Sequence, residues 1–182
     1  SRVIDIKKIN KLPLNIKKKV SKDLRLITAK REFLKKKNHM LMGVLNLTPD
    51  SFSDGGKFNS LKKANKRIKK MIDAGADIID VGGESTRPGS KIVPEVNELQ
   101  RVKKVIKKFK LKYSKTLLSI DTRKSLVMDF AINHNADIVN DVSCFQFDPK
   151  TLEIIKNKNL WKIIHHMQGT PQTMQINPRY DH

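Results

Sequence analysis

Polar side chains follow the apolar runs of this sequence in a regular way. Asn46 ends the first apolar run, Asp121 ends a later one and Asn140 ends the next. Glu84 follows a further apolar run, and His165 ends the last. If the runs are parallel strands, these residues gather at the carboxyl edge of one sheet, where parallel folds build their sites. We therefore predict a polar site at this edge.

Asp121 and Asn140 together indicate a specific kind of recognition. A carboxylate accepts two hydrogen bonds side by side, and an amide both donates and accepts. Such a pair can bind the edge of a fused heterocycle that carries adjacent N–H and N–H₂ groups. A carboxylate that ends a buried strand also needs a partner of this kind. The alternative is that Asp121 or Thr122 caps the helix that follows.

Two Gly-rich loops, residues 48–56 and 82–90, follow the first two apolar runs. Glycines let backbone N–H groups approach a ligand, and the guanidinium of Arg87 can bind a phosphate with two hydrogen bonds. Neither loop has the spacing of a Walker loop or of a GxGxxG turn, so a nucleotide is not indicated. For each loop, a plain connector is the alternative.

The elements that must position these residues alternate along the chain. We predict strands at 39–47, 78–81, 117–121, 138–139 and 162–165, with a helix in each interval. This alternation predicts an α/β fold with a parallel sheet, and both a doubly wound sheet and a (β/α)₈ barrel fit it. A barrel needs about 250 residues, so the chain would supply its first half, four βα units and a fifth strand.

The helical segments carry start and stop signals. Gly75 is a typical residue for ending a helix, and Asp148 followed by Pro149 is a typical helix start. The helix that begins near Pro94 is expected to bury one face. That face consists of Val96, Leu99, Val102, Ile106 and Phe109.

Composition excludes several classes of protein. The 182 residues include one cysteine, Cys144, which excludes a disulfide scaffold and a cysteine-based zinc site. No apolar run is long enough to cross a membrane, and we expect no membrane partner. The net charge of +20 comes mainly from lysine, which we attribute to a genome rich in A/T rather than to a nucleic-acid surface, because aromatic residues are only 5% of the chain.

The two ends of the sequence suggest a fragment. The chain starts at Ser1 without a Met and stops at His182, after a loop that contains proline. Residues 1–38 are basic and lack the apolar core of a signal peptide, so we expect a leader or linker of unknown role and a cytoplasmic protein. Residues 39–182 are expected to form the N-terminal part of a barrel domain.

Two long motifs resemble the signatures of dihydropteroate synthases. Residues 42–56, MGVLNLTPDSFSDGG, resemble the first signature, and residues 80–89, DVGGESTRPG, resemble the second. Supporting matches are Ser119–Thr122, Ile138–Asp141 and His166–Pro171. The resemblance covers about residues 40–182. It implies a TIM barrel and a transferase of folate biosynthesis, which joins 4-aminobenzoate to 6-hydroxymethyl-7,8-dihydropterin diphosphate with release of pyrophosphate.

The resemblance also assigns roles to residues of the site. It implies that Asn46 meets the diphosphate and a Mg²⁺ ion, and that Thr86 and Arg87 bind diphosphate oxygens. Asp121 and Asn140 would hold the pterin ring. Of these residues, Asn46, Arg87 and Asp121 would act on the reaction itself, with Asn46 as the metal ligand.

The second substrate would be covered by the two loops. The resemblance implies that Asp50, Ser51 and Phe52, together with Arg87 and Pro88, close over the 4-aminobenzoate. Sulfonamides would compete at this position. The mechanism needs no nucleophilic side chain, because the diphosphate leaves before the amine attacks.

The sequence also departs from the family. A later Asp, a Lys and a terminal Arg-x-His pair are absent, so we expect this chain alone to be inactive and the full-length protein to be a homodimer. His165 stands where many members have Met, and we interpret it as a tolerated wall residue. The alternatives are a methyltetrahydrofolate-binding methyltransferase module, a basic RNA-binding protein and a remnant that binds pterin without turnover.

Overall fold

The computed structural model describes residues 39–48, 57–85, 90, 92–165, 169 and 173, and only the backbone at residues 57–60. The chain divides into two units, Ser1–His39 and Met40–His182, and nearly all described residues belong to the second. The predicted leader and the loop residues Asp50–Phe52 and Thr86–Pro88 lie outside the described residues. In the part described, no helix has the length and apolar character needed to span a membrane.

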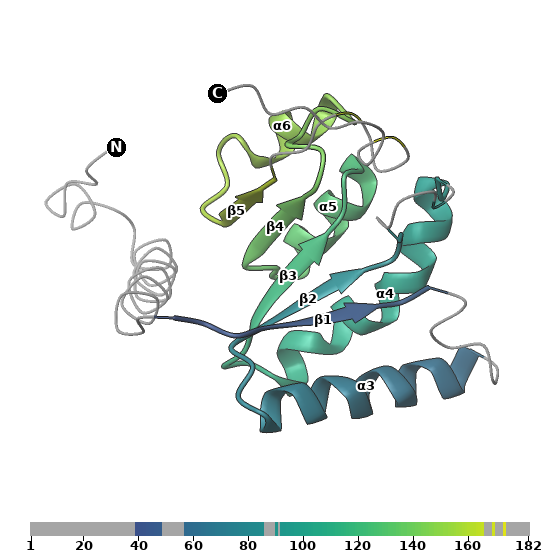
Figure 1. Cartoon of the computed structure of the whole chain (residues 1–182), viewed down its shortest axis with the longest axis vertical. Coiled ribbons are helices and arrows are strands. Elements are labelled where there is room, and N and C mark those ends of the chain that lie inside the picture. Colours follow the sequence, from purple (N-terminus) through teal and green to yellow (C-terminus); the bar gives the residue numbers. More distant parts are fainter. Residues whose placement is uncertain are drawn as a thin grey trace, which may run out of the picture. The chain divides into compact units, whose positions relative to one another are not determined.

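Five parallel strands form one sheet in the order in which they occur along the chain (Figure 1). They are β1 (Met42–Asn46), β2 (Ile78–Gly82), β3 (Leu117–Asp121), β4 (Ile138–Asp141) and β5 (Trp161–Ile164). Each predicted strand is confirmed. The first is shorter than predicted, because it begins at Met42 rather than at residue 39.

Helices alternate with these strands along the described chain. They are α3 (Lys57–Asp73), α4 (Glu95–Lys112), α5 (Ser125–Asn133) and α6 (Lys150–Ile155). Because the strand order never reverses, right-handed crossovers place these helices on one face of the sheet, where each contacts the next. A doubly wound sheet requires a reversal of strand order. The arrangement is therefore that of part of a (β/α)₈ barrel, with four βα units and a fifth strand as predicted.

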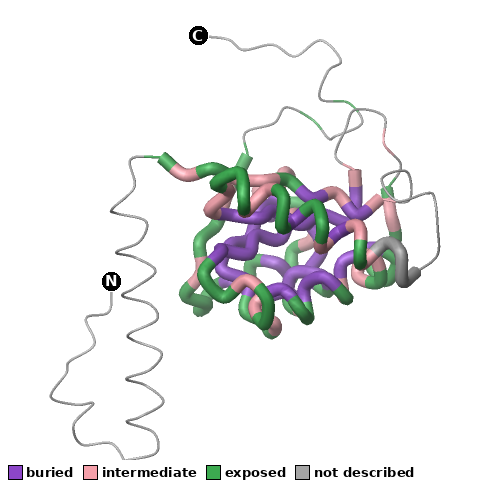
Figure 2. Tube along the Cα trace, turned by 90° about the horizontal axis from the view of Figure 1, so that it is seen from below, coloured by how far each residue is buried: buried purple, intermediate pink, exposed green. Residues whose placement is uncertain are grey.

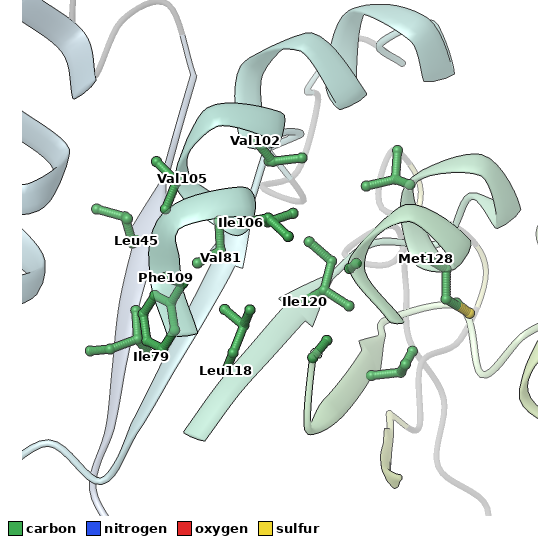
Figure 3. Packing of buried hydrophobic residues seen from close by; sticks show 14 of the residues in the cluster. Leu45, Ile79, Val81, Val102, Val105, Ile106, Phe109, Leu118, Ile120 and Met128 are labelled. Atoms are coloured by element: carbon green, nitrogen blue, oxygen red, sulfur yellow. The ribbon is translucent and has the colours of Figure 1, made fainter. Parts of the chain in front are cut away.

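The hydrophobic core lies between the sheet and the helices (Figure 3). Leu45, Ile79 and Leu118 point from alternate strand positions toward the helices and are completely buried. Ile106 and Phe109 of α4 pack against them. Figure 2 shows buried residues along the sheet and exposed residues along the outer sides of the helices. The main apolar cluster thus lies on the helix-covered face of the sheet.

Helix α4 departs from its predicted burial at its first turn. The three later positions of the predicted face are buried, but Val96 is 55% exposed and Leu99 is only partly buried. Glu98 takes the inner position instead and is completely buried. The helix lies very close to the end of β2 here, because a Cβ on Gly83 would lie 2.8 Å from Glu98 Cγ. Hydrophobic spacing could not reveal a buried carboxylate at this position.

The predicted helix boundaries at Gly75 and Asp148 are confirmed. Gly75 adopts a φ of +99° two residues after the end of α3, in the left-handed region that favours glycine. Asp148 Oδ1 accepts the backbone N–H of Lys150, the first residue of α6, at 3.0 Å. Both residues therefore act as the sequence predicts.

The capping alternative for the third predicted helix is wrong for Asp121. Helix α5 has no side-chain cap at its N-cap residue, Lys124, and the N–H of Ser125 donates to Asp148 Oδ2 at 2.8 Å. Thr122 Oγ1 accepts the N–H of Lys124 at 3.2 Å. The carboxylate of Asp121 is thus left to the site face of the sheet.

Candidate active site

One row of residues crosses the whole sheet at the carboxyl ends of its strands. Asn46 pairs in register with Gly82, which pairs with Asp121. Asp121 pairs with Asn140, which pairs with Ile163 of β5. The neighbouring strand residues point into the helix-covered core, so the row faces the opposite side. The structure thus brings together three of the predicted site residues.

Gly82 lies between Asn46 and Asp121 in this row and has no side chain to separate them. A Cβ at Gly82 would lie 3.2 Å from Asp121 Oδ2 and 3.3 Å from Asn46 Oδ1. The oxygens of two side chains therefore converge over a residue that has none. A ligand that approaches the sheet at this position can reach both oxygens, whereas any larger residue would crowd them.

Asp121 is in an electrostatic environment that disfavours its charge. Burial raises its pKa to about 7, and the nearby carboxylates of Asp80, Glu98, Asp141 and Glu84 add to the rise. Near neutral pH the carboxyl group is therefore ready either to hold a proton or to accept a hydrogen bond from a donor. A cationic or N–H-rich ligand would relieve the repulsion among these acids.

A chain of hydrogen bonds links three strands on the same face. Asn140 Nδ2 donates to Asp80 Oδ2 at 3.0 Å. The Nε2 atom of His165, just after β5, lies 2.7 Å from Asn140 Oδ1. The amide of Asn140 is thus held from both sides. Sequence analysis had singled out Asn140 and His165 but not Asp80, whose only signal was an acidic residue inside an apolar run.

Two buried oxygens beneath the row lack a hydrogen-bond partner within the described part of the chain. They are Asp80 Oδ1 and Ser119 Oγ, whose residues pair in register on β2 and β3. Burial raises the pKa of Asp80, and the adjacent hydroxyl of Ser119, the hydrogen bond from Asn140 and the nearby His165 offset only part of this rise. Unpaired buried polar atoms are costly, so these oxygens mark a place where a ligand or water would find partners.

A second group of charges lies behind the row, toward the helices. Glu84 accepts a hydrogen bond from Arg123 Nε at 3.0 Å, and Lys124 Nζ lies 3.0 Å from its other oxygen. Lys124 Nζ also donates to Glu98, whose other oxygen accepts the hydroxyl of Thr122 at 2.7 Å. We call Glu84, Glu98, Arg123 and Lys124 the ion network. Its two acids and two bases balance each other in a buried environment.

The ion network also holds the ends of the second Gly-rich loop. Glu84 Oε1 accepts the backbone N–H of Val93 at 2.7 Å, and Ser90 Oγ donates to the carbonyl of Ser85 at 2.5 Å. Because Arg123 and Lys124 directly follow the end of β3, the network connects this loop to the strand that carries Asp121. The site and the loop are thus supported by the same buried charges.

The strand end that carries Asn140 is also braced from within the chain. Asp141 Oδ1 accepts the N–H and the hydroxyl of Ser143, both at 2.7 Å, and Oδ2 accepts the N–H of Phe145 at 3.1 Å. Cys144 and Phe145 adopt left-handed backbone conformations with φ values of 55° and 61°. The Asp141 carboxylate therefore stabilises a strained turn next to the site.

The residues described here offer limited coordination to a metal. Within the described ranges, no three or more His, Cys, Asp or Glu residues are grouped to hold a metal ion. Mg²⁺ commonly takes one or two protein oxygens and completes its shell with phosphate oxygens and water. Asn46 Oδ1, which faces the gap over Gly82, is one such oxygen. The site fits a magnesium ion that is bound mainly through a phosphate ligand.

Comparison with known proteins agrees with the resemblance seen in the sequence. A family described as "Pterin binding enzyme" matches residues 42–182. A dihydropteroate synthase of Haemophilus influenzae is 46% identical over 141 residues, which make up 78% of this chain and 50% of that protein. The chain spans about half the length of the curated relatives it matches most strongly.

Solved structures show the same relationship. A Yersinia pestis dihydropteroate synthase, in complex with a sulfonamide drug, is 43% identical with a TM-score of 0.71, and the match covers 79% of this chain and 51% of that one. A Xanthomonas albilineans dihydropteroate synthase with 4-aminobenzoic acid is 37% identical with a TM-score of 0.67, over 78% and 49% of the two chains. With its family match, its barrel-type sheet and its row of polar residues, this chain belongs to the pterin-binding enzymes.

Proposed function

We propose that this chain is part of a dihydropteroate synthase. The reaction would join the amine of 4-aminobenzoate to the methylene carbon of 6-hydroxymethyl-7,8-dihydropterin diphosphate. The observation that carries the proposal is the row of Asn46, Asp121 and Asn140, in which the oxygens of Asn46 and Asp121 converge over Gly82. The similarity to dihydropteroate synthases over this same region supports it.

Asp121 and Asn140 bind the pterin in this proposal. The ring presents N–H and N–H₂ donors, which an ionised carboxylate accepts and an amide complements. When the C–O bond to the diphosphate breaks, its electron pair leaves with the diphosphate and positive charge spreads over the ring. A carboxylate at Asp121 stabilises that charge. The amine nitrogen then bonds to the carbon and loses a proton.

Asn46 binds the diphosphate end of the substrate. Its amide oxygen would contribute one ligand to a Mg²⁺ ion, which, when bound, neutralises charge on the leaving diphosphate. Thr86 and Arg87 are assigned to the diphosphate oxygens. Because Asn46 and Asp121 both pair in register with Gly82, they could act on the two ends of one substrate.

The loops provide the second substrate site. Asp50, Ser51 and Phe52 would close over 4-aminobenzoate together with Arg87 and Pro88, which excludes water from the reactive carbon. The similarity to a sulfonamide-bound and a 4-aminobenzoic-acid-bound synthase supports this assignment. We also propose that the full-length protein is a cytoplasmic homodimer. Neither the methyltransferase alternative nor the RNA-binding alternative is favoured by the comparisons.

A direct assay tests the proposal. The protein encoded by the whole reading frame that contains this sequence is purified and given both substrates with Mg²⁺. We expect 7,8-dihydropteroate to form, and we expect Asp121→Ala to abolish most of it. Lys69→Ala, an exposed residue of α3, serves as the control and should keep full activity. If the whole protein makes no dihydropteroate, the proposed function is wrong.

The chain alone provides a second test. We expect the purified 182 residues to form no dihydropteroate, because the family places further substrate contacts in later residues. Product formation by this chain alone would show that the second half of the site is not needed.

A further inference from the structure

The proposed reaction assigns no role to His165, although this residue contacts Asn140 of the site. His165 Nε2 lies 2.7 Å from Asn140 Oδ1, and Asn140 Nδ2 lies 3.0 Å from Asp80 Oδ2. We propose that His165 is a positioning residue, which fixes the direction of the Asn140 amide and thereby the edge of the heterocycle that the site accepts. The inference rests on the proposed function and deepens it.

The direction of an asparagine amide decides what it can recognise. Its oxygen has two lone pairs and its nitrogen has two hydrogens. Here one hydrogen is used on Asp80 and one lone pair is used on His165, so one donor and one acceptor remain for a ligand. A rotation of the amide by 180° would exchange these two and present the wrong group to each part of a ring edge.

Asp80 alone does not fix this direction. Asp80 is buried, with 3% of its surface exposed, and burial favours its protonated form. A protonated Asp80 donates a hydrogen bond, so it is compatible with the rotated amide. An ionised Asp80 is compatible only with the amide direction seen here.

His165 adds the second constraint. An imidazole that carries its proton on Nε2 donates to Asn140 Oδ1, and a doubly protonated imidazole does the same. The rotated amide would need a proton on Asp80 and a bare Nε2 on His165 at once. Without His165, the proton on Asp80 would be enough. The residue therefore raises the free energy of the rotated state and preorganises the site for its ligand.

The position of His165 supports a role in the site, in place of the tolerated wall residue that the sequence suggested. Asn140 pairs in register with Ile163, and His165 is two residues further along the same face of β5. The side chain is exposed, so burial of the ring does not explain the contact. Its ring forms a hydrogen bond with the site residue Asn140.

The test compares two variants in the whole protein. His165→Met removes the donor and keeps side-chain size, and His165→Gln keeps an N–H donor near the position of Nε2. We expect His165→Met to raise KM for the pterin diphosphate about 10-fold, the effect of one hydrogen bond, with kcat and KM for 4-aminobenzoate within about 2-fold. His165→Gln should restore KM to within about 3-fold of the parent.

Controls separate positioning from folding and from the function itself. His39→Met makes the same change at an exposed residue ahead of β1 and should leave KM unchanged. Melting temperatures of all variants should agree, which excludes partial unfolding as the cause. An active parent with the same KM as His165→Met would overturn the role of His165 alone. A parent that makes no dihydropteroate would overturn the proposed function and this inference together.

A measurement without turnover tests the hydrogen bond directly. In ¹⁵N NMR spectra of the imidazole at pH 8, we expect the proton of His165 on Nε2, with a shift in its signal in Asn140→Ala. A proton on Nδ1 instead would contradict the proposal, because Nε2 could then only accept.

Discussion

Asp80 lies within β2 and Glu84 lies just after it, but their carboxylates are in opposite surroundings. Burial would raise the pKa of Glu84, yet the N–H of Val93 and the cations of Arg123 and Lys124 outweigh it and lower the pKa. Burial also raises the pKa of Asp80, and there the Ser119 hydroxyl, the amide of Asn140 and His165 together do not compensate for it. One oxygen of Asp80 has no partner among the residues described.

This difference distinguishes the charged residues that support the fold from those that form the candidate site. In the ion network, each acid has a base and each carboxylate oxygen has a hydrogen-bond donor. On the open face, the carboxylates of Asp80 and Asp121 form no ion pair with another described residue, and the pKa of Asp121 rises to about 7. A protein tolerates such unpaired acids where a ligand supplies the missing donors. Buried carboxylates without an ion-pair partner, rather than buried carboxylates in general, therefore mark the site.

The largest change in the free energy of unfolding is expected on substitution of Lys124. Lys124→Met leaves Glu84 and Glu98 buried without their shared cation, so we expect unfolding to become easier by about 3–5 kcal/mol. Urea denaturation of the variant and the parent measures the change. Lys69→Met, in the exposed pair with Asp73, is the matched control and should show no measurable change. Equal stability of both variants would mean that the ion network is not structural.

Substitution of Asp121, unlike that of Lys124, is expected to change activity rather than stability near neutral pH. Asp121→Asn keeps the shape of the side chain and removes the charge that would stabilise the reacting pterin. We expect kcat/KM for the pterin diphosphate to fall about 100-fold, as for other lost electrostatic contacts to a transition state. Steady-state kinetics of the whole protein measure this. A variant with unchanged kinetics would place the reactive ring elsewhere.

Two adjacent glycines at the end of β2, Gly82 and Gly83, allow the site and the ion network to be compared. A Cβ on Gly83 would meet Glu98 Cγ at 2.8 Å and its backbone oxygen at 3.0 Å, so Gly83→Ala should destabilise the fold by about 1–3 kcal/mol. A Cβ on Gly82 would meet only the site oxygens of Asp121 and Asn46. Gly82→Ala should cost under about 1 kcal/mol and raise KM several-fold.

Urea denaturation and steady-state kinetics of both glycine variants test whether Gly83→Ala mainly lowers stability and Gly82→Ala mainly raises KM. The prediction is wrong if Gly82→Ala is the less stable variant, or if Gly83→Ala changes KM while its stability stays at the parent value.

The contrast also predicts a modest pH dependence of stability. The folded-state pKa of Asp121 is raised, so its favourable contribution is full below about pH 4 and is lost as the pH rises through about 7. Asp121→Asn should therefore match the parent at pH 4 and exceed it by about 1–2 kcal/mol at pH 8, since partial exposure limits the penalty. Urea denaturation across this pH range measures the difference, and a difference that does not vary with pH would contradict it.

The sequence allowed most of the sheet and part of the site to be predicted. Asn46, Asp121 and Asn140 were found because each ends an apolar run, and parallel strands align such ends in space. Asp80 was missed because it lies within its run, where an acid is an exception to the pattern. Glu98 was missed for a related reason: its partner Lys124 comes from a different helix start, and no periodicity encodes that pairing.

The unbroken strand order has a consequence for how the molecule assembles. Every pairing in the sheet joins a strand to the one made just before it, from β1 with β2 to β4 with β5. Among the five described strands, each pairing closes only one βα unit of the chain, which keeps the loop-closure cost of each pairing small. The sheet can therefore grow by one strand and one helix at a time, from β1 onward, as the chain leaves the ribosome.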